Sequence, residues 1–288
     1  MIAQELTTLI ERAERVLGQL EAWLPPAPPP INWESHAFRW RKRGSRGWLD
    51  AVRHVARIGV DDLHHIERQK DIIDRNTRHF LEGKPANNVL MTGARGTGKS
   101  SLVKAMLARY ADRGLRLIEV DKSDLADLGD IVELVAPRPE RFIIFCDDLS
   151  FEEGEAGYKE LKSVLDGSVA ASGDNVLIYA TSNRRHLMPE YMSENLSAKH
   201  QPDGEIHPGE TVEEKISLSE RFGLWLSFYP FKQDDYLDIV HYWLRTHGCS
   251  PESIEASRTE ALQWALERGS RSGRVARQFA RDWAARHV

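Results

Sequence analysis

The sequence predicts an α/β protein, with a five-stranded parallel sheet covered by helices on both faces and a small helical domain at the C-terminal end. Two observations indicate this fold class. Five short apolar runs alternate with helical patterns between residues 61 and 230, which favours a parallel sheet with both faces covered. Strand patterns then stop after Pro230, and only helical patterns follow. The predicted strands lie within residues 87–93, 116–121, 141–148, 175–183 and 223–230, and the predicted C-terminal helices lie near residues 232–247, 252–268 and 272–287.

The composition is that of an ordinary globular chain. Its 288 residues are enough for one large domain or two small ones, and 41% of them are hydrophobic and 29% charged. A net charge of −5 excludes a protein that coats nucleic acid through bulk charge alone. The two cysteines cannot build a disulfide framework. The longest apolar run, Phe142–Cys146, is far shorter than the roughly 20 residues that span a bilayer, and the N-terminus does not resemble a signal peptide. We therefore expect a cytoplasmic protein with no membrane segment.

Residues 1–30 are predicted to form an amphipathic helix and a spacer. Apolar residues recur at helical spacing over residues 1–24 and form one stripe. The proline-rich run at 25–30 cannot continue a helix and favours a stiff, extended conformation. The helix therefore needs another surface to cover its apolar stripe.

Residues 31–60 form a basic segment that contains several aromatic residues. Seven Arg or Lys residues stand against two acidic ones, and Phe38, Trp40 and Trp48 lie among the positive side chains. Two interpretations are open. Residues 39–57 bind nucleic acid through phosphate contacts and base stacking, or the segment is a solvated arm whose tryptophans pack on the following domain. The second is favoured, because phosphate contacts supply only non-specific affinity.

The strongest motif is GARGTGKS at Gly93–Ser100, which matches the phosphate-binding pattern G-x-x-x-x-G-K-[ST], or Walker A. It follows a predicted strand and precedes a helical pattern, as such a loop requires. Its glycines allow backbone N–H groups to approach phosphate oxygens closely, and the helix N-terminus adds a favourable dipole. Lys99 is expected to contact the β- and γ-phosphates, and the Ser100 hydroxyl to ligate magnesium. The predicted nucleotide contacts in this segment are Gly93, Ala94, Arg95, Gly96, Thr97, Gly98, Lys99, Ser100 and Ser101.

Two further polar groups are predicted at the same edge of the sheet. The apolar strand RFIIFCDD ends in Asp147 and Asp148, which matches a Walker B motif. We expect Asp147 to organise the metal ion and Asp148 to polarise the attacking water. An Asp pair can also begin a surface turn, but the neighbouring phosphate loop disfavours that interpretation. Asn183 ends the next strand and is expected to reach the γ-phosphate and its water.

The motif order GARGTGKS, FCDD, ATSN, LSERFG and SGRVARQF resembles that of AAA+ ATPases. From about residue 31 to 287 the chain is similar to an uncharacterised bacterial group of AAA+ ATP-binding proteins, which is known as a domain-of-unknown-function family. The resemblance implies a sheet with strand order 5-1-4-3-2 and a helical lid. It also implies ATP and Mg²⁺ as cofactors, an α/β nucleotide-binding core at 61–230 and a lid at 231–288.

The same resemblance assigns roles to five residues outside the loop and the Asp pair. Asn183 resembles sensor 1, and Arg274, in the lid, resembles sensor 2, which contacts the γ-phosphate of the same chain. Arg221 resembles the arginine finger that acts on the nucleotide of the neighbouring subunit. Leu63 and Ile66 are the expected contacts to adenine. A finger that acts in trans implies a nucleotide-dependent homo-oligomer.

The function that these residues imply is hydrolysis of Mg-ATP at subunit interfaces to remodel or load an unknown macromolecular partner. One departure leaves an alternative open, because the usual Asp-Glu of the Walker B motif is Asp147-Asp148 here. The alternative is an ATP-gated binding switch with little hydrolysis, which presents its N-terminal helix or basic arm to a protein or nucleic-acid partner. A small-molecule P-loop kinase is disfavoured, because its lid normally lies within the α/β core.

Three features remain without an assigned role. The polar insertion at 192–217 either responds to nucleotide and partner or is a solvated loop. Arg184 and Arg185, just after Asn183, either contact phosphate or pair with this acidic insertion. Arginines at helical spacing near the C-terminus form a basic face, which meets DNA or a neighbouring subunit or is solvated lid surface. They are Arg271, Arg277, Arg281 and Arg286.

Overall fold

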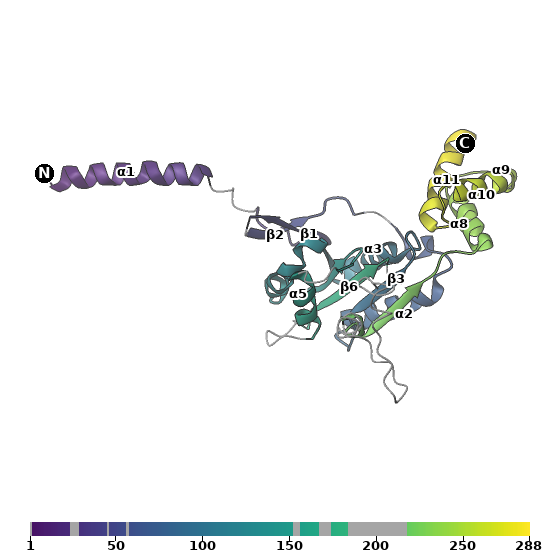
Figure 1. The fold of residues 1–288 in the computed structure, drawn as a ribbon, viewed down its shortest axis with the longest axis horizontal. Helices are drawn as coiled ribbons and strands as arrows, with labels where there is room; N and C mark the ends of the chain where they lie inside the picture. Colours follow the sequence, from purple (N-terminus) through teal and green to yellow (C-terminus); the bar gives the residue numbers. More distant parts are fainter. Residues whose placement is uncertain are drawn as a thin grey trace, which may run out of the picture.

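A seven-stranded, mostly parallel sheet lies at the centre of the protein, with strand order β2-β1-β4-β5-β6-β3-β7 (Figure 1). The computed structural model describes residues 2–23, 29–44, 46–55, 58–151, 156–166, 174–183 and 218–288. The strands are β1 (Ala37–Arg43), β2 (Arg46–Ala51), β3 (Val89–Gly93), β4 (Leu115–Glu119), β5 (Arg141–Cys146), β6 (Val176–Ser182) and β7 (Leu224–Phe228).

The five predicted parallel strands are all present. They are β3 to β7, and their order in the sheet is β4-β5-β6-β3-β7, with every neighbouring pair parallel. Counted along the chain from β3, this is the expected order 5-1-4-3-2. Phe142 to Cys146 in β5 are completely buried, which explains why the central strands read as continuous apolar runs. The α/β fold class predicted from the sequence is therefore confirmed.

The sheet has seven strands and not five, because the basic segment adds two. Strand β1 pairs in parallel with β4, and β2 returns antiparallel to β1. Phe38 and Trp40 in β1 are buried, whereas Arg39 and Arg41 alternate with them and are more exposed. This alternation of aromatic and basic residues has the period of a half-buried strand. The prediction of a basic arm rested on the charges of the segment and did not take this period of two into account.

Helices cover both faces of the sheet. Side chains of α2 (Glu67–Leu81) and α3 (Lys99–Tyr110) share one core with Ile143 of β5, and those of α4 (Leu128–Val135) and α5 (Ala156–Leu165) share the other core with Ile144. Adjacent residues of a strand point to opposite faces, so one apolar run supplies both cores. Short 3₁₀ turns connect these elements at Val60–Asp62, Ala111–Arg113 and Lys122–Asp127.

The C-terminal residues fold into a group of helices at one end of the molecule (Figure 1). These are α8 (Gln233–Thr246), α9 (Pro251–Ala256), α10 (Arg258–Glu267) and α11 (Gly273–His287). One helix was predicted where α9 and α10 stand. The Ser257 hydroxyl donates to the Ile254 carbonyl oxygen at 2.7 Å, which competes with the hydrogen bonding of a continuous helix and accounts for the break.

The predicted N-terminal helix is α1 (Ile2–Trp23), and it lies apart from the rest of the molecule (Figure 1). Its side chains Leu9 and Leu17 are 67% and 57% exposed. The apolar stripe is therefore uncovered by the described part of the chain. Among the described helices, none combines the length and apolarity needed to cross a membrane.

Candidate nucleotide-binding site

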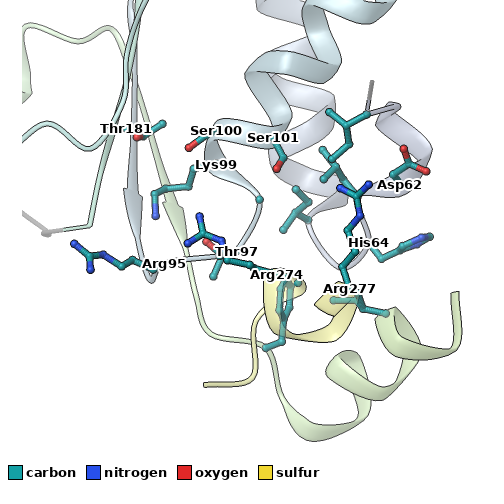
Figure 2. A pocket seen from close by; sticks show the side chains of 18 of the residues that line it. Asp62, His64, Arg95, Thr97, Lys99, Ser100, Ser101, Thr181, Arg274 and Arg277 are labelled. Atoms are coloured by element: carbon teal, nitrogen blue, oxygen red, sulfur yellow. The ribbon is translucent and has the colours of Figure 1, made fainter. Parts of the chain in front are cut away.

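A cleft of about 670 Å³ lies between the carboxyl edge of the sheet and the C-terminal helices (Figure 2). The loop at 93–100 and the ends of β5 and β6 supply residues on one side, and α8 and α11 supply residues on the other. The segment before α2 lines one end. Every sequence-predicted site residue outside Gly93, Ala94 and Arg221 lines this cleft.

The loop glycines have backbone conformations that other residues rarely adopt. Gly93, Gly96 and Gly98 have φ angles of 129°, 75° and 104°. At Gly93 there is also no room for a side chain, since an added Cβ would lie 1.8 Å from the carbonyl oxygen of Phe228 in the neighbouring strand β7. The spacing of these glycines therefore reflects both a left-handed loop and close packing of the loop on the sheet.

Gly93→Ala is expected to lower the thermal stability strongly. The added methyl group has to displace the backbone of β7, and overpacking of this kind costs roughly 1–3 kcal/mol beyond the cost of the unfavourable φ. The matched control is Gly114→Ala, where φ is 90° but no atom lies within 4 Å of the added Cβ. Equal melting temperatures for the two variants would contradict the packing account.

Lys99 begins α3 and is almost completely buried beneath the loop. Its ammonium group donates to the carbonyl oxygens of Gly93 and Ala94 at 2.6 and 2.8 Å, and to Asn183 Oδ1 at 3.1 Å. Burial lowers the pKa of Lys99, against the opposing effect of Asp147 and Asp148. The charged lysine is thus held by neutral oxygens, close to two carboxylates at the end of β5.

Asp147 connects the loop to two strands. Its Oδ1 accepts hydrogen bonds from the Ser100 hydroxyl at 2.6 Å and from the Thr181 hydroxyl at 2.5 Å. Thr181, near the end of β6, also accepts from the backbone N–H of Asp148 at 2.9 Å. Sequence reasoning assigned no role to Thr181, although it directly precedes the Ser-Asn pair that ends the same strand. The result is a compact set of oxygen atoms around Ser100.

Asp148 has a left-handed backbone, with φ at 54°. Asn183 Nδ2 donates to its Oδ1, and the guanidinium of Arg95 lies 3.5 Å from its Oδ2. Asp and Asn adopt left-handed φ more readily than most residues. The backbone at this position therefore favours Asp over the longer Glu of the usual motif.

The N-terminus of α11 contacts the phosphate-binding loop directly. The backbone N–H of Gly273 donates to the Gly96 carbonyl oxygen at 2.9 Å. A Cβ added at Gly96 would lie 3.3 Å from the Cβ of Arg274, so Arg274 stands beside the loop, as the sensor 2 resemblance requires (Figure 2).

Two further arginines of α11, Arg277 and Arg281, also line the cleft. Sequence reasoning placed them on an outward basic face, because helical spacing alone does not show which side a helix packs on. Arg286 of the same predicted face pairs instead with Glu260 and Asp282.

The end of the cleft that is lined by the segment before α2 is apolar on both walls. Leu63 and Ile66 are 7% and 5% exposed, and they lie within 4 Å of a Cβ added at Gly98. Phe231, Ile239 and Trp243 line the side of the C-terminal helices. This pairing of apolar walls beside a polar loop suits a flat base attached to phosphates.

His64 adds a polar group at that end. Its ring packs on Tyr242 with the centroids 4.2 Å apart, and burial lowers its pKa, so the neutral form is favoured.

Arg221 stands outside the cleft as the described residues form it. Its Nε lies 2.5 Å from Oδ1 of Asp166, just after α5. The predicted roles of Arg184, Arg185 and the insertion at 192–217 concern residues outside the described ranges.

Comparisons with known proteins identify one family and several structures of similar fold. A family model described as "Protein of unknown function (DUF815)" matches residues 33–287. Among curated proteins, no sequence matches the chain. A RuvB variant of Thermotoga maritima is similar in structure, with a TM-score of 0.51 and 13% identity, over 77% of this chain and 63% of that one. The ORC1 protein of Aeropyrum pernix, solved in complex with DNA, has a TM-score of 0.51 and 16% identity, over 78% of this chain and 61% of that one.

This chain therefore spans less than two thirds of the length of either structure. At such low identity the likeness shows the fold alone, and the fold is that of the AAA+ ATPases. The family model covers most of the chain, including the loop, the Asp pair and the C-terminal helices. The chain therefore belongs to the family described as Protein of unknown function (DUF815) and has the fold of the AAA+ ATPases.

Proposed function

We propose that the protein binds Mg-ATP in this cleft and hydrolyses it at subunit interfaces, to remodel or load a macromolecular partner. One observation carries the proposal: the buried Lys99 and the Ser100–Asp147 hydrogen bond stand together beneath a glycine loop at the mouth of the cleft. A triphosphate is the ligand that such a loop and lysine fit best.

The residues around Ser100 suit a magnesium ion. Mg²⁺ prefers hard oxygen ligands, and the Ser100 hydroxyl and the Asp147 carboxylate already share one hydrogen bond of 2.6 Å. Bound there, the ion would neutralise charge that develops on the β- and γ-phosphates. The Thr181 hydroxyl donates a second hydrogen bond to the Asp147 oxygen that accepts from Ser100, and so holds this carboxylate in place.

Asp148 and Asn183 are proposed to position the attacking water. They are hydrogen-bonded to each other, and Asn183 also contacts Lys99. In this arrangement the Asn183 amide connects Lys99, which would contact the γ-phosphate, with Asp148, which would accept the proton of the water. Arg274 approaches the loop from the lid and supplies positive charge to the same phosphate.

Arg221 is proposed to complete the site of a neighbouring subunit. Its position outside its own cleft supports a role in trans, and its ion pair with Asp166 would have to open when it reaches the neighbouring site. Such a finger stabilises the charge of the transition state only when subunits assemble. We therefore propose a nucleotide-dependent homo-oligomer.

A second candidate function is an ATP-gated switch with little hydrolysis. Asn183 donates a hydrogen bond to Asp148 and the guanidinium of Arg95 lies 3.5 Å from it, so the carboxylate has to give up contacts within the chain before it can take a proton from water. In this case ATP binding itself would change the affinity of α1 or of the β1–β2 hairpin for a protein or nucleic-acid partner.

Asp148→Asn separates the two functions. Asn tolerates the left-handed backbone but cannot accept the proton, so steady-state ATP hydrolysis is expected to fall by about 10²- to 10⁴-fold while ATP affinity is kept. Asp121→Asn, which changes the carboxylate that follows β4 away from the cleft, is the control. If wild type and Asp148→Asn hydrolyse ATP equally slowly, the switch is favoured and the role of Asp148 is wrong.

A further inference from the structure

We propose that Arg277, stacked on Trp243, is the base-binding residue of the cleft and makes it prefer purine over pyrimidine nucleotides. This inference rests on the proposed nucleotide-binding function and extends it to the recognition of the base. The sequence motifs assign no role to either residue in nucleotide binding.

The guanidinium of Arg277 is held on a fixed aromatic surface. Its Cζ lies 4.6 Å from the centroid of the Trp243 ring. Trp243 is 7% exposed, belongs to the core of the lid, and has the ring of Tyr242 against it at 5.1 Å. The indole therefore cannot easily turn away, and the planar guanidinium above it loses little freedom when a second flat group stacks on it.

The position of Arg277 along α11 places it at the base end of the cleft. Arg274 stands beside the loop, and Arg277 follows one helical turn later, about 4.5 Å further along the axis. It lines the cleft together with His64 and Asp62, which come from the segment before α2 (Figure 2). A nucleotide with its phosphates on the loop would therefore bring its base between Leu63 and Ile66 on one side and Arg277 on the other.

The charges around Arg277 also favour a stacking role. Among the described residues, no carboxylate forms an ion pair with Arg277, whose guanidinium contacts the ring of Trp243 instead. Asp62, at the same end of the cleft, is already hydrogen-bonded to the Tyr242 hydroxyl and to the backbone N–H of Gly59. The guanidinium face is thus available to an uncharged aromatic ligand, and a purine offers the larger surface.

Calorimetric titration with ATP, CTP and inorganic tripolyphosphate, each with Mg²⁺, tests this inference. Tripolyphosphate is the phosphate chain of ATP without the nucleoside, so it separates base stacking from phosphate binding. Arg277→Gln is expected to weaken ATP binding roughly tenfold and to reduce the preference for ATP over CTP, because base stacking contributes on that order. Binding of tripolyphosphate is expected to stay within about twofold of wild type.

Two further variants complete the test. Arg277→Lys keeps the charge but loses the flat guanidinium, so it is expected to behave like Arg277→Gln. Arg268→Gln removes another arginine of the lid that stacks on a tryptophan, Trp264, outside the cleft, and serves as the matched control.

Equal losses of ATP and tripolyphosphate affinity in Arg277→Gln, or wild-type behaviour of Arg277→Lys, would overturn the stacking role and leave the proposed function standing. Failure of the wild-type protein to bind either ligand would overturn both.

Discussion

Lys99→Ala is expected to abolish ATP binding, with an affinity loss on the order of a hundredfold or more. The ammonium group is buried beneath the loop, where an ionic hydrogen bond to phosphate is weakly screened and worth several kcal/mol. A bound γ-phosphate would accept the hydrogen bonds that the Lys99 ammonium group now donates to Gly93, Ala94 and Asn183. Equilibrium titration with Mg-ATP measures this effect directly.

The variant is expected to remain folded, since burial already disfavours the charged lysine, as its lowered pKa indicates. Thermal melting checks this point. Lys104→Ala, on the same helix but outside the cleft, controls for the loss of a lysine. ATP affinity that survives in Lys99→Ala would refute the assignment of the phosphate loop.

Arg221→Ala is expected to lose ATP hydrolysis by about 10³- to 10⁵-fold while ATP binding is kept. The arginine lies outside its own cleft, so ground-state binding to the same chain does not depend on it. Its ion pair with Asp166 is at the surface, with side chains 24% and 47% exposed, and such a pair contributes at most about 1 kcal/mol to stability. Stability is therefore expected to change little.

The matched control is Arg109→Ala. Arg109 forms a comparable surface ion pair with Asp74, at 2.7 Å, on the outer side of α3. Full hydrolysis by Arg221→Ala, or a loss of hydrolysis that follows a loss of ATP binding, would exclude the role of a finger in trans.

The central sheet was largely predictable from the sequence because its strands are buried on both faces. Continuous apolar runs such as Phe142–Cys146 have no competing interpretation once they alternate with helical patterns. The strands β1 and β2, which lie at one end of the sheet, escaped prediction because only part of each is buried. There, basic residues such as Arg39, which pairs with Glu119, dominate the composition and conceal the period of two.

The candidate site was likewise predictable from the sequence only in part. The loop, Lys99, Ser100 and Asp147 could be placed from local motifs, since one strand, one turn and one helix fix their geometry. Arg277 and Thr181 could not, because their roles depend on how distant elements pack. Arg277 reaches the cleft because α11 packs on α8 and brings the arginine over Trp243, and a helical repeat of arginines does not encode that packing.

Two copies of the chain are proposed to complete one nucleotide site, and mixing two inactive variants is a direct test of this arrangement. Lys99→Ala keeps its finger but lacks a working site, whereas Arg221→Ala keeps its site but lacks the finger. Steady-state ATP hydrolysis is measured for wild type, for each variant alone and for their mixture, across protein concentration. Wild-type specific activity is expected to rise with concentration, and the mixture is expected to recover hydrolysis that neither variant has alone. A mixture that is only the sum of two inactive variants, beside a wild type whose activity does not depend on concentration, would contradict this arrangement.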